Sequence, residues 1–152
     1  MNDFKRLRLM VRAWLILAAA LLAAYWVGWL ADRGVVATSH TAGYFAFEQA
    51  FPLADVWLIA AIVMAALQLS RRRPSALIWL EVVGGVGLYL CALDVLYDLQ
   101  HGIYTDGGGG ALDIAINLFI AISSIGVMAF GWRFRHELFG NSPDHSSQRS
   151  RL

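Results

Sequence analysis

The residues whose types and spacing best suit chemistry are Asp94, Asp98 and His101. They form an Asp-x3-Asp-x2-His run near the end of a long apolar stretch, with Tyr97 and Gln100 between them. If this stretch is helical, the three side chains share one face, because residues three, four and seven apart are neighbours on a helix. Carboxylate and imidazole groups at this spacing could bind a divalent cation, the one cofactor that the sequence suggests. The two acids alone could instead hold an amine.

The position of Asp94 and Asp98 also needs an explanation. Both lie at the C-terminal end of their expected helix, where the helix dipole is negative and a carboxylate is disfavoured. They stand one turn apart, so each raises the energy of the other when both are ionised. We therefore expect a compensating cation or cationic ligand. The alternative is a pair of water-exposed acids at a frayed helix end.

Two further acids lie where helices are expected to begin. Asp55 and Asp113 each fall in a first helical turn, where the dipole stabilises a carboxylate, and capping alone would explain both. Asn117 and Ser124 follow Asp113 at four and eleven residues, which predicts a polar stripe on the fourth helix. Such a stripe should face the interior of a membrane protein, where polar groups find partners.

Glu81 is the exceptional acid, because it lies within an apolar stretch. An ionisable residue inside a membrane span indicates function by default, although Arg71, Arg72 or Arg73 could reach towards it as a structural ion pair. At 100° per residue, Glu81 points about 140° away from Asp94 on a straight helix. One pocket containing both is therefore not expected. The candidate ligand-binding residues are Glu48, Asp55, Glu81, Asp94, Tyr97, Asp98, Asp113 and Asn117.

The elements that must position these residues are membrane spans. Hydrophobic residues make up 59% of the 152 residues and charged residues 15%, against about 25% charged in a typical soluble domain. Stretches of about 20 apolar residues, enough to cross a bilayer core, occur at about 13–31, 52–70, 75–97 and 112–132. The sequence predicts an all-α integral membrane four-helix bundle with short loops over residues 1–140. Residues 141–152 are predicted to form a disordered cytoplasmic tail.

The distribution of basic residues predicts the orientation. Eleven of the twelve Lys and Arg residues flank the start of the first span, the second loop or the end of the fourth span, and only Arg33 lies on the other side. Basic residues are retained in the cytoplasm. We therefore expect a multi-pass protein of the cell membrane with both termini cytoplasmic. High Ala, Arg and Gly usage indicates a bacterial inner membrane, and a cleaved signal peptide is disfavoured because the first apolar run is too long.

Small and aromatic residues predict how the helices pack. A four-residue ladder of Ala20, Ala24 and Gly28, and a shorter one of Ala61 and Ala65, should allow close helix approach. The six Trp residues are expected to be interfacial anchors, and the aromatic loop 32–51 is expected to lie flat on the headgroups. The four glycines 107–110 are expected to be mobile.

Several function classes are excluded by absent motifs. The sequence has no glycine-rich phosphate loop, CxxC, HExxH or GxSxG, and its single Cys91 cannot form an internal disulfide. All four His residues fall outside the spans, which argues against membrane haem. In outline, four short helices with scattered acids resemble the emopamil-binding type of sterol isomerase, as do many small bacterial membrane proteins. That resemblance assigns no role to any residue.

Three functions remain open. The first is a non-enzymatic membrane protein that binds a partner or a cationic or lipophilic ligand at an acidic outer-face mouth. The second is an oligomeric cation or proton transporter or channel subunit, with Glu81 and the outer acids forming the route. The third is an intramembrane lipid-modifying enzyme that uses Asp or Glu acid–base chemistry. The expected partners are the lipid bilayer and a second copy or another membrane protein, and no nucleic acid is expected.

Overall fold

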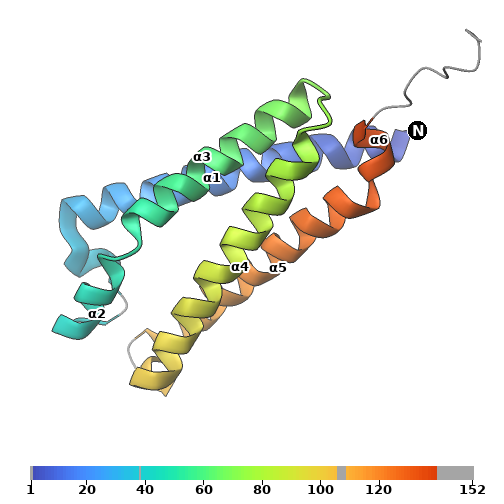
Figure 1. Cartoon of the computed structure of the whole chain (residues 1–152). Helices are drawn as coiled ribbons and strands as arrows, with labels where there is room; N and C mark the ends of the chain where they lie inside the picture. The colour runs from blue at the N-terminus through green and yellow to red at the C-terminus, as the bar shows by residue number, and fades with distance from the viewer. Residues whose placement is uncertain (1, 38, 106–108, 140–152) are drawn as a thin grey trace, which may run out of the picture.

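The computed structural model describes residues 2–37, 39–105 and 109–139, and these residues form helices joined by short connections, with no strand (Figure 1). Four stretches in them are long and apolar enough to cross a membrane. The long helices are α1 (Asn2–Val36), α3 (Pro52–Ser70), α4 (Ala76–His101) and α5 (Gly110–Arg133). The short ones are α2 (Ala42–Glu48), the 3₁₀ turn η1 (Ile103–Thr105) and α6 (Arg135–Phe139). The prediction of an all-helical chain with four helices long and apolar enough to span a membrane is confirmed for these residues.

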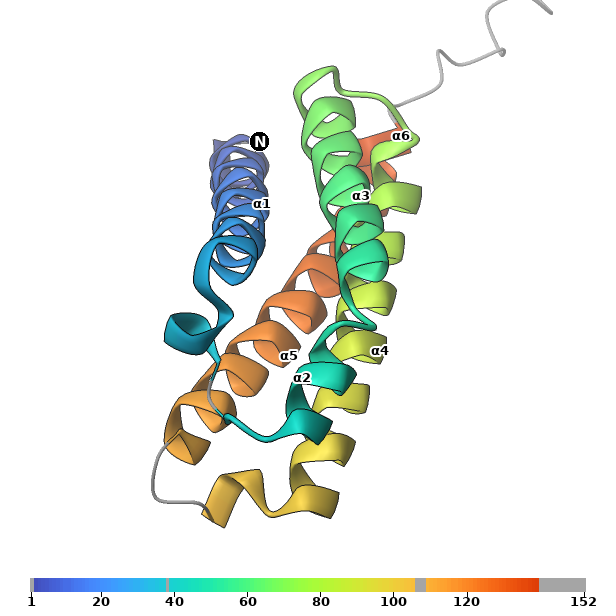
Figure 2. The ribbon, with the colours of Figure 1, turned by 90° about the vertical axis from the view of Figure 1, so that its left-hand side faces the viewer.

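The long helices give the molecule two chemically different ends (Figures 1 and 2). Helix α3 packs against both α1 and α4, and α4 packs along α5. The start of α1, the α3–α4 turn and α6 lie together at one end, which we call the basic end. The acidic end holds α2, η1, the start of α3 and the start of α5 (Figure 1). The predicted tail, residues 141–152, lies outside the described residues.

The connection between α4 and α5 is fixed by two glycines. Gly102 follows the last residue of α4 with a left-handed φ of 68°, so α4 runs to His101 before it ends. Gly110 begins α5 and is buried, and a Cβ there would lie 2.5 Å from the backbone oxygen of Ile103. Only glycine permits this approach, so Gly110 is required by packing. Gly107 and Gly108 lie outside the described residues.

The basic half of the molecule is closely packed. Residues such as Ala61, Ala65, Leu69 and Leu80 are 0% exposed and form a core with side chains from α1, α4, α5 and α6. The predicted packing role of Ala61 and Ala65 is therefore confirmed. The predicted Ala20, Ala24 and Gly28 ladder on α1 forms no helix contact among the described residues, since Ala20 and Ala24 are exposed and half-buried Gly28 faces Val36 of the same helix. Helix α1 presents the face carrying Leu15, Ala19 and Trp26 to the protein, because that face packs against α3.

Aromatic residues at the acidic end pack inside the protein. Helix α1 kinks at Asp32, which has non-helical backbone angles, and the chain then returns as α2. As a result Trp26, Trp29 and Tyr44 are buried in one cluster with Ile103. The prediction that every Trp is an interfacial anchor is wrong for Trp26 and Trp29, because both are buried. Within the loop 32–51, α2 packs on α1 and α4 side chains, and a position of this loop at the headgroups stays a prediction.

Candidate functional site

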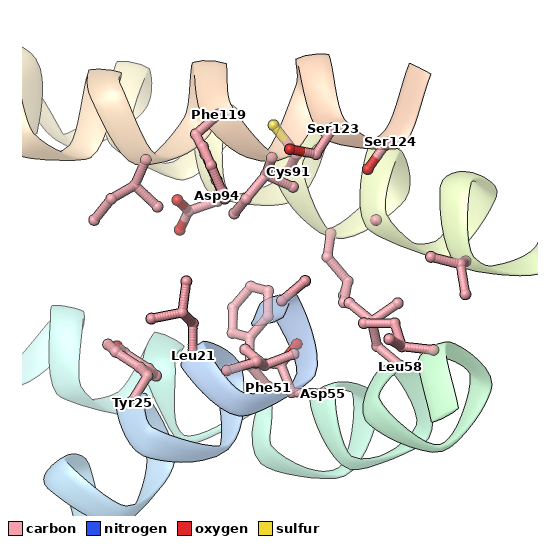
Figure 3. A pocket seen from close by; sticks show the side chains of 18 of the residues that line it. Leu21, Tyr25, Phe51, Asp55, Leu58, Cys91, Asp94, Phe119, Ser123 and Ser124 are labelled. Carbon is pink, nitrogen blue, oxygen red and sulfur yellow. The ribbon is translucent and has the colours of Figure 1, made fainter. Parts of the chain in front are cut away.

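A cavity of about 550 Å³ lies between α1 and α3 on one side and α4 and α5 on the other (Figure 3). Its volume is within the range of about 300–1,000 Å³ that is usual for small-molecule sites. Most of the lining is apolar, as such sites usually are. The polar lining residues gather towards the acidic end and towards α5: Tyr25, Tyr44, Glu48, Asp55, Cys91, Asp94, Asp113, Ser123 and Ser124.

Two buried acids are held on the α1–α3 side. Asp55 lies in the first turn of α3, and the indole Nε1 of Trp26 donates to its Oδ2 at 2.8 Å. Glu48 ends α2, and the hydroxyl of Tyr25 donates to its Oε2 at 2.9 Å. Neutral donors therefore fix both carboxylates, and neither bond cancels a negative charge.

The α4–α5 side carries a second polar group. Asp94 and Asp98 share one face of α4, and Asn117 faces them from α5. The Asn117 amide donates to Asp98 Oδ2 at 3.4 Å and to the Tyr104 hydroxyl at 3.1 Å, and it lies within reach of Asp94. Cys91 donates its thiol to the Asn117 backbone oxygen at 3.3 Å. Asp98 is only 1% exposed, so it is not a frayed, water-exposed acid.

Tyr104 supports this group from η1. Burial, together with the nearby Asp98 carboxylate, raises the pKa of the Tyr104 hydroxyl to about 12. The hydroxyl therefore remains protonated over the physiological range and keeps its proton for donation, while it accepts from Asn117. Tyr104, which lies in η1 between the two long helices, thus connects Asp98 of α4 to Asn117 of α5.

The cavity is lined by acidic side chains without described basic ones. Four carboxylates line it, from Glu48, Asp55, Asp94 and Asp113, and none of its described lining residues is Lys, Arg or His. Asp94 and Asp55 lie on opposite sides of the cavity (Figure 3). Asp94 acts electrostatically on Asp55 and Glu48, and Asp113 acts on Asp94. Like charges in a low-dielectric space repel strongly, so a cation or bound protons would lower the energy of this arrangement.

The structure brings most of the sequence-predicted acids together. Glu48, Asp55, Asp94 and Asp113 line the cavity, and Asp98 and Asn117 lie directly behind it. The predicted polar stripe on the fourth helix is buried, as expected for Asp113, Asn117 and Ser124.

Tyr97 has a structural place beside the cavity. Its ring stacks on Phe47 of α2 with the centroids 3.8 Å apart, and it does not line the cavity. The ring of His101 also stacks on the Tyr97 ring, with the centroids 4.0 Å apart. The His101 Nδ1 donates to the Tyr97 backbone oxygen at 2.9 Å. Tyr97 therefore fastens α2 to α4.

The predicted metal set of Asp94, Asp98 and His101 receives no support. Among the described residues, no group of three His, Cys, Asp or Glu side chains is close enough to hold a metal ion. His101 is exposed and engaged with its own helix, whereas Asp98 points to Asn117. Helical spacing placed the three on one face correctly, but side-chain contacts direct them apart.

Glu81 lies away from the cavity, as its angle on α4 predicts. Its Oε1 is buried without a hydrogen-bond partner and faces Gly131 of α5, where an added Cβ would lie 3.0 Å from it. The expected ion pair with the arginines of the α3–α4 turn is not seen among the described residues, since those arginines are exposed and Glu81 turns towards α5.

Sequence reasoning missed Tyr25, Trp26, Tyr44, Cys91 and Tyr104. One spacing carried a usable signal: Cys91 lies seven residues before Asp98 on α4, which is about two helical turns. The residues that contact these side chains come from other helices, so local spacing in the sequence does not reveal them.

Comparisons with protein-family models, with curated proteins and with solved structures give no match. The outline resemblance to sterol isomerases therefore gains no support. Any function must be argued from the cavity itself.

Proposed function

We propose that this protein binds a lipophilic cation, with the charged group among the carboxylates and the apolar body along the cavity wall. One observation carries the proposal: four carboxylates from α2, α3, α4 and α5 face a cavity of about 550 Å³ whose described lining contains no basic side chain. A ligand with a positive charge and an apolar body complements both features.

An organic amine suits the site better than a metal ion. Hard cations require six or more close oxygen ligands, and no three-ligand cluster exists in the described residues. An ammonium group needs only a few acceptors and can be placed between carboxylates that are further apart. Asp94 is central, because it interacts electrostatically with Glu48, Asp55 and Asp113.

The apolar wall indicates where the rest of the ligand lies. Leu21 of α1 and Leu112, Ile116 and Phe119 of α5 line the cavity, yet they are 53%, 58%, 41% and 44% exposed. Helices α1 and α5 are therefore not closely packed beside the cavity. In a bilayer this gap would face lipid, so a lipophilic ligand could enter from the membrane.

The closely packed core of the basic half favours binding over transport through a single copy of the protein. The cavity ends at the closely packed core of the basic half, which includes Leu69 and Leu80 at 0% exposure. Glu81 does not line the cavity and faces α5 near Gly131. A cation route through the molecule would have to cross this apolar core, so transport would require a rearranged or oligomeric form.

The proposed setting is the cell membrane with both termini in the cytoplasm. Nine of the eleven basic residues assigned to the cytoplasmic side are described, and they lie at the basic end: Lys5, Arg6, Arg8, Arg12, Arg71, Arg72, Arg73, Arg133 and Arg135. Retention of these residues in the cytoplasm would place the acidic mouth outside.

The test is thermal unfolding of the purified full chain in a neutral detergent with decylamine, 1-decanol or decanoate. A ligand that binds only the native state raises its apparent stability in a concentration-dependent way. We expect decylamine to stabilise the protein and the neutral and anionic chains not to. Asp94→Asn should weaken the decylamine response by about tenfold or more in concentration, because a hydrogen bond to a charged group is worth about 1.5–3 kcal/mol.

The matched control is Asp3→Asn, which removes an exposed acid at the other end of the molecule. It should respond to decylamine like the wild type. Equal stabilisation by decanol and decylamine, or an unchanged response in Asp94→Asn, would contradict the proposal.

A further inference from the structure

A second, smaller pocket lies at the basic end. Its volume is about 190 Å³, and it is lined by residues of α1, the α3–α4 turn and α6, which lie together in Figure 1: Phe4, Lys5, Arg8, Arg72, Glu137 and Leu138. We call it the basic pocket. It is separate from the acidic cavity, and the two share no lining residue.

The charges of the basic pocket are unbalanced. Lys5, Arg8 and Arg72 contribute three positive charges from two segments, against one negative charge from Glu137. Arg72 and Arg12 also lie close enough to Arg8 to act on it electrostatically. An anion placed among these groups would relieve their repulsion.

The backbone of Arg72 gives an independent indication. The N–H of Arg73 bonds to the oxygen of Gln68 and the N–H of Arg72 to that of Leu69, which is the Schellman pattern at a helix end. Arg72 occupies the left-handed position of this motif, with a φ of 53°, where glycine is strongly preferred. The strained position places a long basic side chain where glycine would fit without strain, and that side chain lines the pocket.

The floor of the pocket is apolar. Phe4 stacks near Phe130 and Phe134 with centroids 6.3 and 5.3 Å away, and Leu138 is buried. Arg8 lies over the Phe4 ring, with its guanidinium carbon 5.9 Å from the centroid. A group of cations above an apolar floor, at the end of membrane-length helices, matches a phosphate that carries acyl chains.

We propose that the basic pocket binds the phosphate of an anionic phospholipid. The cytoplasmic leaflet, where positive charge is retained, is also the leaflet rich in anionic lipid, and each Lys or Arg near it contributes about 1 kcal/mol. The lipid would fasten α1 to the α3–α4 turn and to α6. This site is independent of the ligand bound in the acidic cavity.

The test compares two single-charge variants, Arg72→Gly and Arg73→Gln, in the full chain in neutral detergent. Arg73 is exposed, adjacent to Arg72 and outside the pocket. Apparent thermal stability is measured with dioctanoyl phosphatidylglycerol, dioctanoyl phosphatidylcholine or inorganic phosphate. We expect phosphatidylglycerol to stabilise the wild type and Arg73→Gln alike, and phosphatidylcholine to have little effect. Arg72→Gly should require about fivefold more phosphatidylglycerol for the same shift.

Arg72→Gly should fold at least as well as the wild type, because glycine is preferred at that backbone position. If it does not fold, Lys5→Gln compared with Arg6→Gln provides the same contrast, since Lys5 lines the pocket and Arg6 does not. An equal loss of response in the pocket variant and its control would overturn the proposal. So would an equal response of the wild type to both lipids, and a full response to inorganic phosphate would overturn the lipid as the source of the anion.

Discussion

The two ends of this molecule use the same four helices in opposite ways. At the basic end, residues such as Ala61, Ala65 and Leu80 are 0% exposed and fill the space between helices. Towards the acidic end, the space between α1 and α3 on one side and α4 and α5 on the other is a cavity with carboxylates on both sides. Small side chains bring helices together at one end, whereas polar side chains with fixed partners hold a cavity at the other.

The comparison teaches where stability and recognition reside. Packing energy comes from atoms in contact, so the basic half should carry most of the stability. The acidic half contains repelling carboxylates, which is a cost that a binding site commonly bears. The predictions below test this division, beginning with the largest effect.

Truncating a leucine should lower the free energy of unfolding strongly at the packed end and very little at the cavity. Leu80→Ala removes a side chain that is 0% exposed, and we expect a loss of about 2–5 kcal/mol. Leu21→Ala, at a cavity wall position that is 53% exposed, should change stability by about 0.5 kcal/mol or less. Denaturant-induced unfolding in detergent measures both. Similar losses in the two variants would remove the contrast between the ends.

The next effect concerns the donor that fixes Asp55. Trp26→Phe leaves the buried Asp55 Oδ2 without its 2.8 Å hydrogen bond, and we expect a loss of about 1–3 kcal/mol. Trp57→Phe is the control, because Trp57 is 55% exposed on the same helix as Asp55. The same unfolding measurement compares them. If both variants lose equally little, the Trp26–Asp55 bond does not hold the site.

The sequence predicted the spans and the faces of the acids well. Uncharged stretches identify spanning helices from composition alone, and helical spacing correctly places Asp94 with Asp98 and Asp113 with Asn117. These features depend only on local periodicity. The burial of Asp98 could not be predicted, because it depends on Asn117 and Tyr104 arriving from another helix and a turn.

The cavity could not be predicted from the sequence either. It exists because α1 packs against α3 and meets α5 through the rings of Trp14 and Phe119, whereas Leu21 further along α1 stays exposed. Helix pairing of this kind leaves no trace in local spacing. The buried Trp26 shows the same limit. A Trp near a span end fits both an interfacial anchor and a donor to Asp55, and only the fold decides between them.

The smallest predicted effect is an alkaline loss of stability through Tyr104. Its pKa is 10.0 ordinarily and about 12 in the folded protein, so the folded state holds the proton more tightly. The associated stability is fully present below pH 10.0 and is lost as the pH rises towards about 12. Tyr104→Phe cannot titrate, so its apparent Tm should fall less across this window than that of the wild type. Parallel curves at a fixed scan rate would exclude this role.

The most direct test of the central claim is to locate a bound amine in the acidic cavity. A long-chain alkylamine carrying a photoreactive diazirine is irradiated with the purified protein, and labelled residues are mapped by peptide mass spectrometry. We expect labels at cavity-wall residues of α1 and α5, such as Leu21, Ile116 and Phe119, which excess decylamine suppresses and Asp94→Asn reduces. Labels spread along all exposed helix faces, with no competition by decylamine and no effect of Asp94→Asn, would contradict the account.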